Sequence, residues 1–205
     1  MSKSRLEAFS DGVFAIAATL LIIRVSVNAP GKALGPALVH AWPQYAAYVL
    51  SFVIIGIWWV NHHAYMDVIG SVDRTFLFAT IMMLVFIAFI PFPTALVAEH
   101  FHDAGLRAAV VTYGLTQLAA AISALFMWRH ASRGRRLIAE AVPQELVKRH
   151  TRDVMLGTPM NAAVVIIAFW LPYFALVVMA VTSMFFVFGG SMLERVSPRS
   201  DQSGG

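Results

Sequence analysis

Asp11 and Thr19 are polar residues inside an otherwise apolar stretch, FSDGVFAIAATLLIIR, at residues 9–24. A carboxylate placed among apolar side chains costs several kcal/mol unless it meets a partner or water. A threonine hydroxyl in a helix either donates to its own backbone or offers its oxygen to a polar ligand. Asp11 therefore indicates an anchoring contact, and Thr19 marks a candidate polar position on the helix.

Donors for Asp11 are supplied by the end of the next apolar segment, WWVNHHAYMD, at residues 58–67. If the first segment leads outward and the second returns, Asp11 and this end lie at one depth. We predict a polar clamp that joins Ser10 and Asp11 to indole, amide and imidazole groups, drawn from Trp58, Trp59, Asn61, His62 and His63. We favour this structural clamp over a catalytic site or a proton relay. Adjacent His side chains diverge on a helix, so we predict no metal site.

A second feature of the first segment is a stripe at about 100° per residue, made of Gly12, Ile16, Thr19, Leu20, Ile23 and Val27. Asp11 points away from it, and Ser10 is predicted to lie squarely on neither face. Such a stripe is most simply a lipid-facing or packed surface. Its single hydroxyl also fits a pore-lining face, and periodicity alone leaves both interpretations open.

The composition is that of a membrane protein. Of 205 residues, 59% are hydrophobic and 13% charged, and the mean hydropathy is +0.72. Soluble domains are about 45–50% apolar and about 25% charged. The chain has no cysteine, which excludes disulfides. The sequence pI of about 9.8 fits basic cytoplasmic loops better than nucleic-acid binding.

The hydropathy pattern predicts an all-α membrane protein with six transmembrane helices in one domain, 1–205. The expected spans are 9–27, 42–61, 75–98, 105–128, 155–171 and 172–191, with Pro172 dividing the last two. Pro91 and Pro93 should kink or stop the third span. A basic cytoplasmic linker is expected at 129–153, containing one short amphipathic helix, and a disordered tail at 196–205.

Charge placement supports this count, with both termini in the cytoplasm of a multi-pass cell-membrane protein. The inner segments then hold Lys3, Arg5, Arg74, Arg129, Arg133, Arg135, Arg136, Lys148, Arg149, Arg152, Arg195 and Arg199. The outer loops hold only Lys32 and Arg107, which is a strong positive-inside bias. Glu7 and Asp11 argue against a cleaved signal peptide at the start.

The first segment resembles the R-x-x-x-F-S-D-G signature of the endosomal/lysosomal potassium channel family (transmembrane protein 175). Arg5, Phe9, Ser10, Asp11 and Gly12 carry the match. Two further stretches are similar to bacterial members: WVNHHAY at 59–65 and IPFPTALVAEH at 90–100. The specific resemblance covers about the first hundred residues.

This resemblance implies a potassium-conducting cation channel without a re-entrant filter loop. Bacterial members carry one six-helix repeat and form homotetramers in which the first helices line the pore. The implied pore layers are Ile16, Thr19, Leu20 and Ile23, the stripe found by periodicity. Relatives carry an Asn in the third helix that contacts the signature network, and Thr80 stands at that position here. The aromatic that follows the His pair in relatives is shifted or replaced around Tyr65 and Met66.

We therefore predict passive potassium permeation through a hydrophobic gate of Ile16, Leu20 and Ile23, with a hydroxyl ring of Thr19 contributing a modest ion selectivity. The partners would be potassium ions and the bilayer, and no cofactor is expected. The alternatives are a secondary transporter, which would need broken helices and internal repeats, and a proton-conducting channel using His62 and His63. Because the chain lacks HExxH and GxSxG motifs, we do not predict an enzyme.

Overall fold

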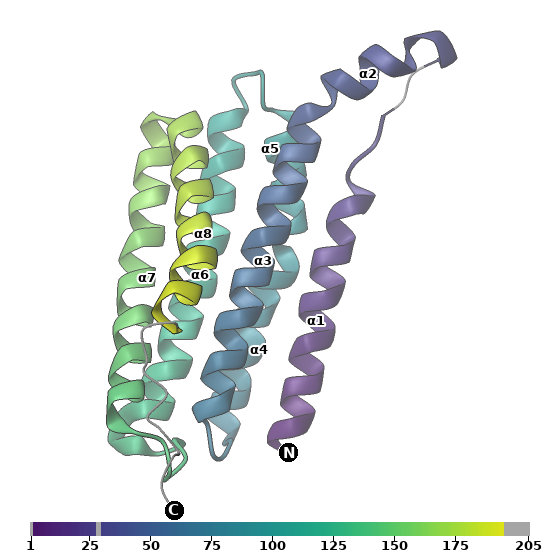
Figure 1. Cartoon of the computed structure of the whole chain (residues 1–205). Coiled ribbons are helices and arrows are strands. Elements are labelled where there is room, and N and C mark those ends of the chain that lie inside the picture. Colours follow the sequence, from purple (N-terminus) through teal and green to yellow (C-terminus); the bar gives the residue numbers. More distant parts are fainter. Residues whose placement is uncertain (1, 28–29, 195–205) are drawn as a thin grey trace, which may run out of the picture.

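A computed structural model describes residues 2–27 and 30–194 (Figure 1). Side chains of the last helix are described as far as Ser183. The elements are α1 (Lys3–Ile23), η1 (Gly31–Ala33), α2 (Leu34–His40), α3 (Trp42–Val68), α4 (Arg74–Phe89), α5 (Pro91–Glu99), α6 (Leu106–Ser132), η2 (Arg133–Arg135), α7 (Gln144–Trp170) and α8 (Pro172–Glu194). The predicted tail at 196–205 lies outside the described residues.

The long helices run side by side in one bundle, and α1 lies at its edge (Figure 1). One face of α1 packs against α3, α4 and α5. Its buried residues recur every three or four positions: Leu6, Ser10, Phe14, Ala17 and Leu21. That is the repeat of one helix face, so the rest of α1 points away from the protomer.

Within the described residues, five helical stretches are long and apolar enough to cross a membrane: α1, α3, α4 with α5, α6 and α7. Helix α8 has 23 residues, of which Pro172–Ser183 form a described apolar part. The sixth crossing therefore stays a prediction. The third stretch breaks at Pro91, where α4 ends and α5 begins, because proline lacks the N–H that would continue the α4 ladder.

The predicted linker at 129–153 needs correction. Helix α6 continues to Ser132, and α7 begins at Gln144 and runs without interruption to Trp170. The expected separate short helix is thus the first turns of α7. These turns have a protein-facing side: the Trp128 indole N–H donates to Thr151 Oγ1 at 2.9 Å, and Val154 is buried. Packing keeps this polar segment helical.

A backbone clip joins the α3–α4 loop to the segment that follows η2. Gly70 N–H donates to Leu137 O at 2.8 Å, and Ala139 N–H donates to Val68 O at 3.1 Å. A Cβ atom on Gly70 would lie 2.9 Å from Ala139 Cα. Glycine is therefore required here by the close approach of two backbones.

Asp73 fixes the start of α4 beside this clip. Its carboxylate accepts from Phe76 N–H at 2.8 Å and lies 2.8 Å from His130 Nε2 on α6. Arg136 Nη2 lies 3.6 Å from the same carboxylate. The hydrogen bond from Phe76, and then the contacts with His130 and Arg136, lower the pKa of Asp73 below its ordinary value.

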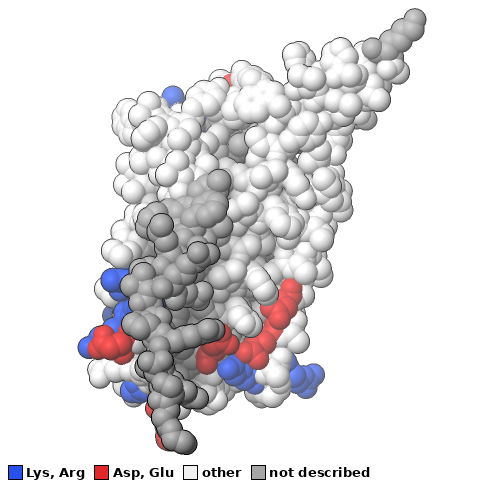
Figure 2. All heavy atoms as spheres, in the orientation of Figure 1, with Lys and Arg blue, Asp and Glu red and all other residues white. Residues whose placement is uncertain are grey.

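On the face drawn in Figure 2, charged side chains gather at the end of the bundle where α1 begins, and few are seen at the opposite end. This distribution is the one expected if the charged end faces the cytoplasm.

We predict that Asp73→Ala lowers the free energy of unfolding by about 1 kcal/mol, because the first turn of α4 loses its cap. Asp73→Asn keeps the acceptor and should cost only a few tenths of a kcal/mol. The charge of Asp73 stabilises the fold fully above the ordinary Asp pKa of about 3.9 and ceases to do so as the pH falls through its lower folded value. Thermal unfolding in detergent at several pH values measures both effects. Equal losses in the two variants would contradict the cap assignment.

Candidate ion pathway along helix α1

The predicted stripe lies on the outward side of α1 in the protomer. Ile16 is 61% exposed, Leu20 42% and Ile23 70%. Gly12 and Thr19 are exposed on the same side. Helix α1 ends at Ile23, so Val27 lies beyond the helical stripe. The protomer therefore presents an aliphatic face that contains one hydroxyl, that of Thr19. Within the described residues, no other part of the protomer covers this face.

The Thr19 hydroxyl donates its proton to the backbone of its own helix. Thr19 Oγ1 lies 3.0 Å from both Ala15 O and Ile16 O, to which it donates. This is the local backbone bond that a helical threonine commonly makes. Because the proton points back to the helix, the free lone pairs of the oxygen face away from it. The group is then an acceptor, which suits a cation.

Asp11 and Trp59 form the polar contact between α1 and α3. Trp59 Nε1 donates to Asp11 Oδ1 at 2.9 Å. The Trp59 ring stacks on His63 with 5.9 Å between centroids and 27° between planes. Trp59 and Asp11 are both exposed in the protomer. The carboxylate thus meets an indole donor from the predicted segment end.

Ser10 requires a correction. It was predicted to lie on neither face, but it is fully buried on the packing face of α1, four residues from both Leu6 and Phe14. His62 is also buried, with its ring 5.7 Å from that of Phe14. Within the described residues, neither Ser10 Oγ nor the His62 nitrogens have a hydrogen-bond partner. The structure brings both groups to buried positions beside Phe14 without bonding them.

Other residues of the predicted network are placed elsewhere. Asn61 lines a cavity together with Trp58. The Thr80 hydroxyl donates to Phe76 O at 2.9 Å and lies 3.3 Å from Met127 Sδ. Arg5 and Phe9 are exposed. Among the described residues, the side-chain hydrogen bond that joins two members of the predicted network is the contact between Asp11 and Trp59.

Sequence reasoning missed a buried polar cluster next to Pro91, where α4 ends and α5 begins. Tyr113 OH donates to Ser51 Oγ at 3.0 Å, and Ser51 Oγ lies 2.8 Å from Thr94 Oγ1. Thr94 also bonds Ile90 O at 2.8 Å. The cluster ties α3, α5 and α6 together at the point where the α4–α5 ladder is interrupted. The closely spaced Pro91 and Pro93 were the signal, because interrupted helices need side-chain partners for their backbone groups.

The long apolar helices define a helical membrane protein, and its edge helix α1 presents an exposed aliphatic face with one hydroxyl. Residues 5–91 match the family model described as Endosomal/lysosomal potassium channel TMEM175. A solved structure of a lysosomal potassium-selective channel TMEM175 homolog from Chamaesiphon minutus superposes with a TM-score of 0.82 and 31% identity, over 91% of this chain and 97% of that one. The chain belongs to the TMEM175 family.

Curated relatives agree with this assignment. A potassium channel of Streptomyces collinus is 45% identical over 137 residues, which is 64% of this chain and 65% of that protein, slightly under two thirds of its length. A potassium channel of Chamaesiphon minutus is 37% identical over 157 residues, 75% of this chain and 77% of the relative. The endosomal/lysosomal proton channel TMEM175 of Gallus gallus is 38% identical over 109 residues, 48% of this chain and 22% of the relative.

We predict that Asp11 and Trp59 are energetically coupled. Asp11→Ala and Trp59→Phe should each destabilise the protein by about 1 kcal/mol, and the double variant should lose less than the sum, because both remove one hydrogen bond to a charged group. Thermal unfolding in detergent supplies the four stabilities of the cycle. Trp170→Phe, at a tryptophan that is 79% exposed, is the matched control. Additive losses would mean that the two side chains do not interact.

Proposed function

We propose that the chain is a potassium-permeable channel that passes ions passively along α1. The single observation that carries this proposal is the exposed aliphatic face of α1 with the Thr19 oxygen within it. The family assignment supports the choice of potassium, since relatives at 45% and 37% identity are potassium channels.

One protomer offers one wall of such a path, so further copies must supply the others. We infer a homotetramer in which the α1 helices meet around a central axis. The exposure of Ile16 and Ile23 supports this arrangement, and so does the position of α1 at the bundle edge (Figure 1). A helix at the centre of the bundle could not present its face to other copies.

The proposed pore combines a gate with a weak ion site. Rings of Ile16, Leu20 and Ile23 would form hydrophobic constrictions, which can close by dewetting. Thr19 oxygens, one turn beyond Ile16, would replace part of the water around a passing ion. Potassium gives up its hydration shell at lower cost than sodium, and a single ring of neutral oxygens supplies only a modest preference.

The orientation follows from charge. With the charged end of the bundle inside (Figure 2), we place both termini in the cytoplasm and the protein in the cell membrane as a multi-pass protein. The Asp11–Trp59 contact would then lie near the cytoplasmic entrance.

Proton conduction is the second candidate, because the Gallus gallus relative is a proton channel and His62 lies buried close to α1. A coupled transporter is the third.

Ion flux into liposomes that hold the purified protein separates these three functions. A channel gives uncoupled potassium flux that exceeds sodium flux. Proton conduction gives acidification without potassium flux, and a transporter moves potassium in a fixed stoichiometry with a second ion.

Thr19→Val tests the hydroxyl ring. We expect the potassium-to-sodium flux ratio to fall about threefold, equivalent to about 0.7 kcal/mol, because valine keeps the shape and removes the oxygen. Thr112→Val is the matched control, since Thr112 on α6 makes the same kind of backbone bond, to Ala108 O at 2.8 Å. A ratio unchanged from that of the control would remove Thr19 from the ion site.

Ile16→Asn tests the gate. A polar side chain holds water in the constriction, so we expect resting potassium flux to rise about tenfold, which corresponds to a barrier about 1.4 kcal/mol lower. Ile122→Asn, at an isoleucine on α6 that is 51% exposed, controls for the effect of an asparagine on an outward face. Equal flux in the two variants, both folded, would sink the hydrophobic gate at this level.

A further inference from the structure

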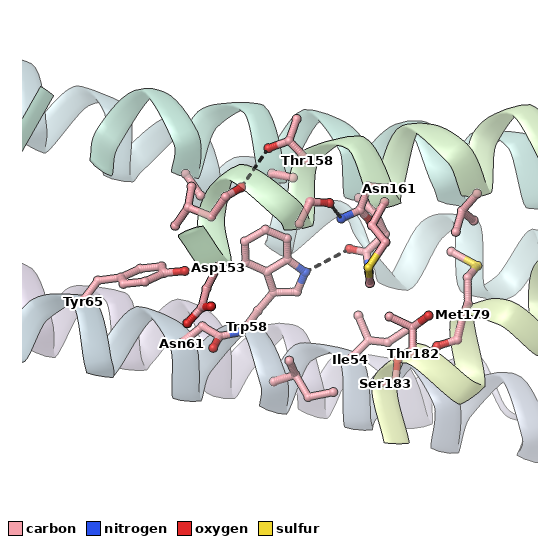
Figure 3. A pocket seen from close by; sticks show the side chains of 18 residues that line it. Ile54, Trp58, Asn61, Tyr65, Asp153, Thr158, Asn161, Met179, Thr182 and Ser183 are labelled. Atoms are coloured by element: carbon pink, nitrogen blue, oxygen red, sulfur yellow. Dashed lines mark hydrogen bonds between the residues drawn. The ribbon is translucent and has the colours of Figure 1, made fainter. Parts of the chain in front are cut away.

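A cavity of about 140 Å³ lies between α3, α6, α7 and α8 (Figure 3). Helix α1 contributes nothing to its described lining, so it is separate from the proposed ion path. Its labelled lining side chains come from helices on several sides and converge on the space beside Trp58.

The lining follows helical spacing on two facing helices. On α3, Trp58, Asn61 and Tyr65 recur at intervals of three and four, and on α7, Asp153, Gly157 and Asn161 recur every four. Each set occupies one face of its helix. Helix α6 opposes them with Ala121 and Ala124, small residues that leave the space open.

The polar groups around the cavity mostly present acceptors. The hydroxyl of Thr158 donates to Val154 O at 3.3 Å and that of Ser183 to Met179 O at 2.7 Å. The Asn161 amide N–H donates to Gly157 O at 2.9 Å. These protons are used within the helices, so the remaining oxygen lone pairs are available to a ligand.

Other groups supply the aromatic and donor character of the site. Trp58 Nε1 donates to Gln117 Oε1 at 3.2 Å, which holds the indole against the cavity. The side-chain amides of Gln117 and Asn61 also line the cavity, and each carries N–H donors. Ile54, Val164 and Met179 make the rest of the described wall largely apolar.

Asp153 supplies the charge. Its Oδ1 lies 3.6 Å from Arg152 Nε, longer than a hydrogen bond, and both side chains are partly exposed, at 40% for Asp153 and 67% for Arg152. Such an exposed pair is weak. The carboxylate, which lines the cavity together with Tyr65, can therefore serve a ligand (Figure 3).

We propose that this cavity binds a small amphiphilic organic ammonium ion. Its ammonium group pairs with the Asp153 carboxylate, and its ring packs at the level of Gly157 against the Trp58 indole. A cavity of about 150 Å³ lined by apolar side chains accepts benzene, so one ring fits the volume. One helical turn, about 5.4 Å, separates Asp153 from Gly157, and the two-carbon link of 2-phenylethylammonium spans that rise. The aromatic walls also favour a cation.

Lipid tails and water suit the cavity less well. A lipid tail would bring no cation to the Asp153 carboxylate, which lines the cavity and is only weakly paired with Arg152. Water would solvate that carboxylate but would not suit the apolar wall of Ile54, Val164 and Met179. An ammonium with one ring matches both parts of the lining.

Equilibrium dialysis of radiolabelled 2-phenylethylammonium against the purified full-length protein tests the proposal. We expect saturable binding that Asp153→Asn weakens at least tenfold. Glu145→Gln is the matched control: it removes a carboxylate from the same helix, one that is 82% exposed and paired with Lys148, and should leave binding unchanged. Neutral 2-phenylethanol, of the same shape, should compete at least tenfold less well.

Gly157→Leu provides a second variant that does not alter charge. A Cβ atom on Gly157 meets nothing within 4 Å, so leucine extends into the open space and should abolish binding without lowering the melting temperature. Binding that is equal in the wild type, Asp153→Asn and Gly157→Leu would show partition into detergent only and overturn the site. The absence of saturable binding to folded wild-type protein would overturn it as well. Neither result depends on ion flux, so the channel proposal is tested separately.

Discussion

The packing of one face of α1 against the neighbouring helices is the constraint on which the rest depends. Leu6, Phe14 and Leu21 are almost completely buried on that face. At about 100° per residue, fixing them fixes the direction of every other side chain on the helix. Ile16 and Thr19 therefore point outward because the packing face leaves them no other direction. A rotation of α1 by two residues would bury the hydroxyl and expose Phe14.

Helix α3 makes polar contacts with both α1 and α6, because adjacent residues on a helix point in different directions. Trp59 donates to Asp11 on α1, whereas Trp58 donates to Gln117 on α6 and lines the cavity. The tryptophan pair thus holds α3 between the edge helix and the interior of the bundle. The outward stripe lies on α1 and the cavity on the other side of α3, so α3 separates the two.

The outward stripe and the acidic contact could be predicted because each depends on local periodicity or on a scarce residue type. Thr19 is the one hydroxyl among aliphatic residues of its face, and Asp11 is a carboxylate in need of a donor. Ser10 was misplaced because a small side chain carries little hydropathy signal, and its burial depends on Leu6 and Phe14. Asn61 and the start of α7 depend on tertiary contacts, such as that of Trp128 with Thr151, which a single sequence does not contain.

Helix α1 is held near both of its ends. Leu6 packs in the buried cluster around Phe76 and Trp128 at its first turns, and beyond its last turn Ser26 N–H donates to Gln44 Oε1 at 2.9 Å. Between these points Phe14 and Leu21 pack in the main core. A helix fixed along its length can narrow or widen a path through its side chains or by moving with its whole protomer. In the proposed pore, the first of these routes would act through side chains such as Ile16, which is 61% exposed in the protomer.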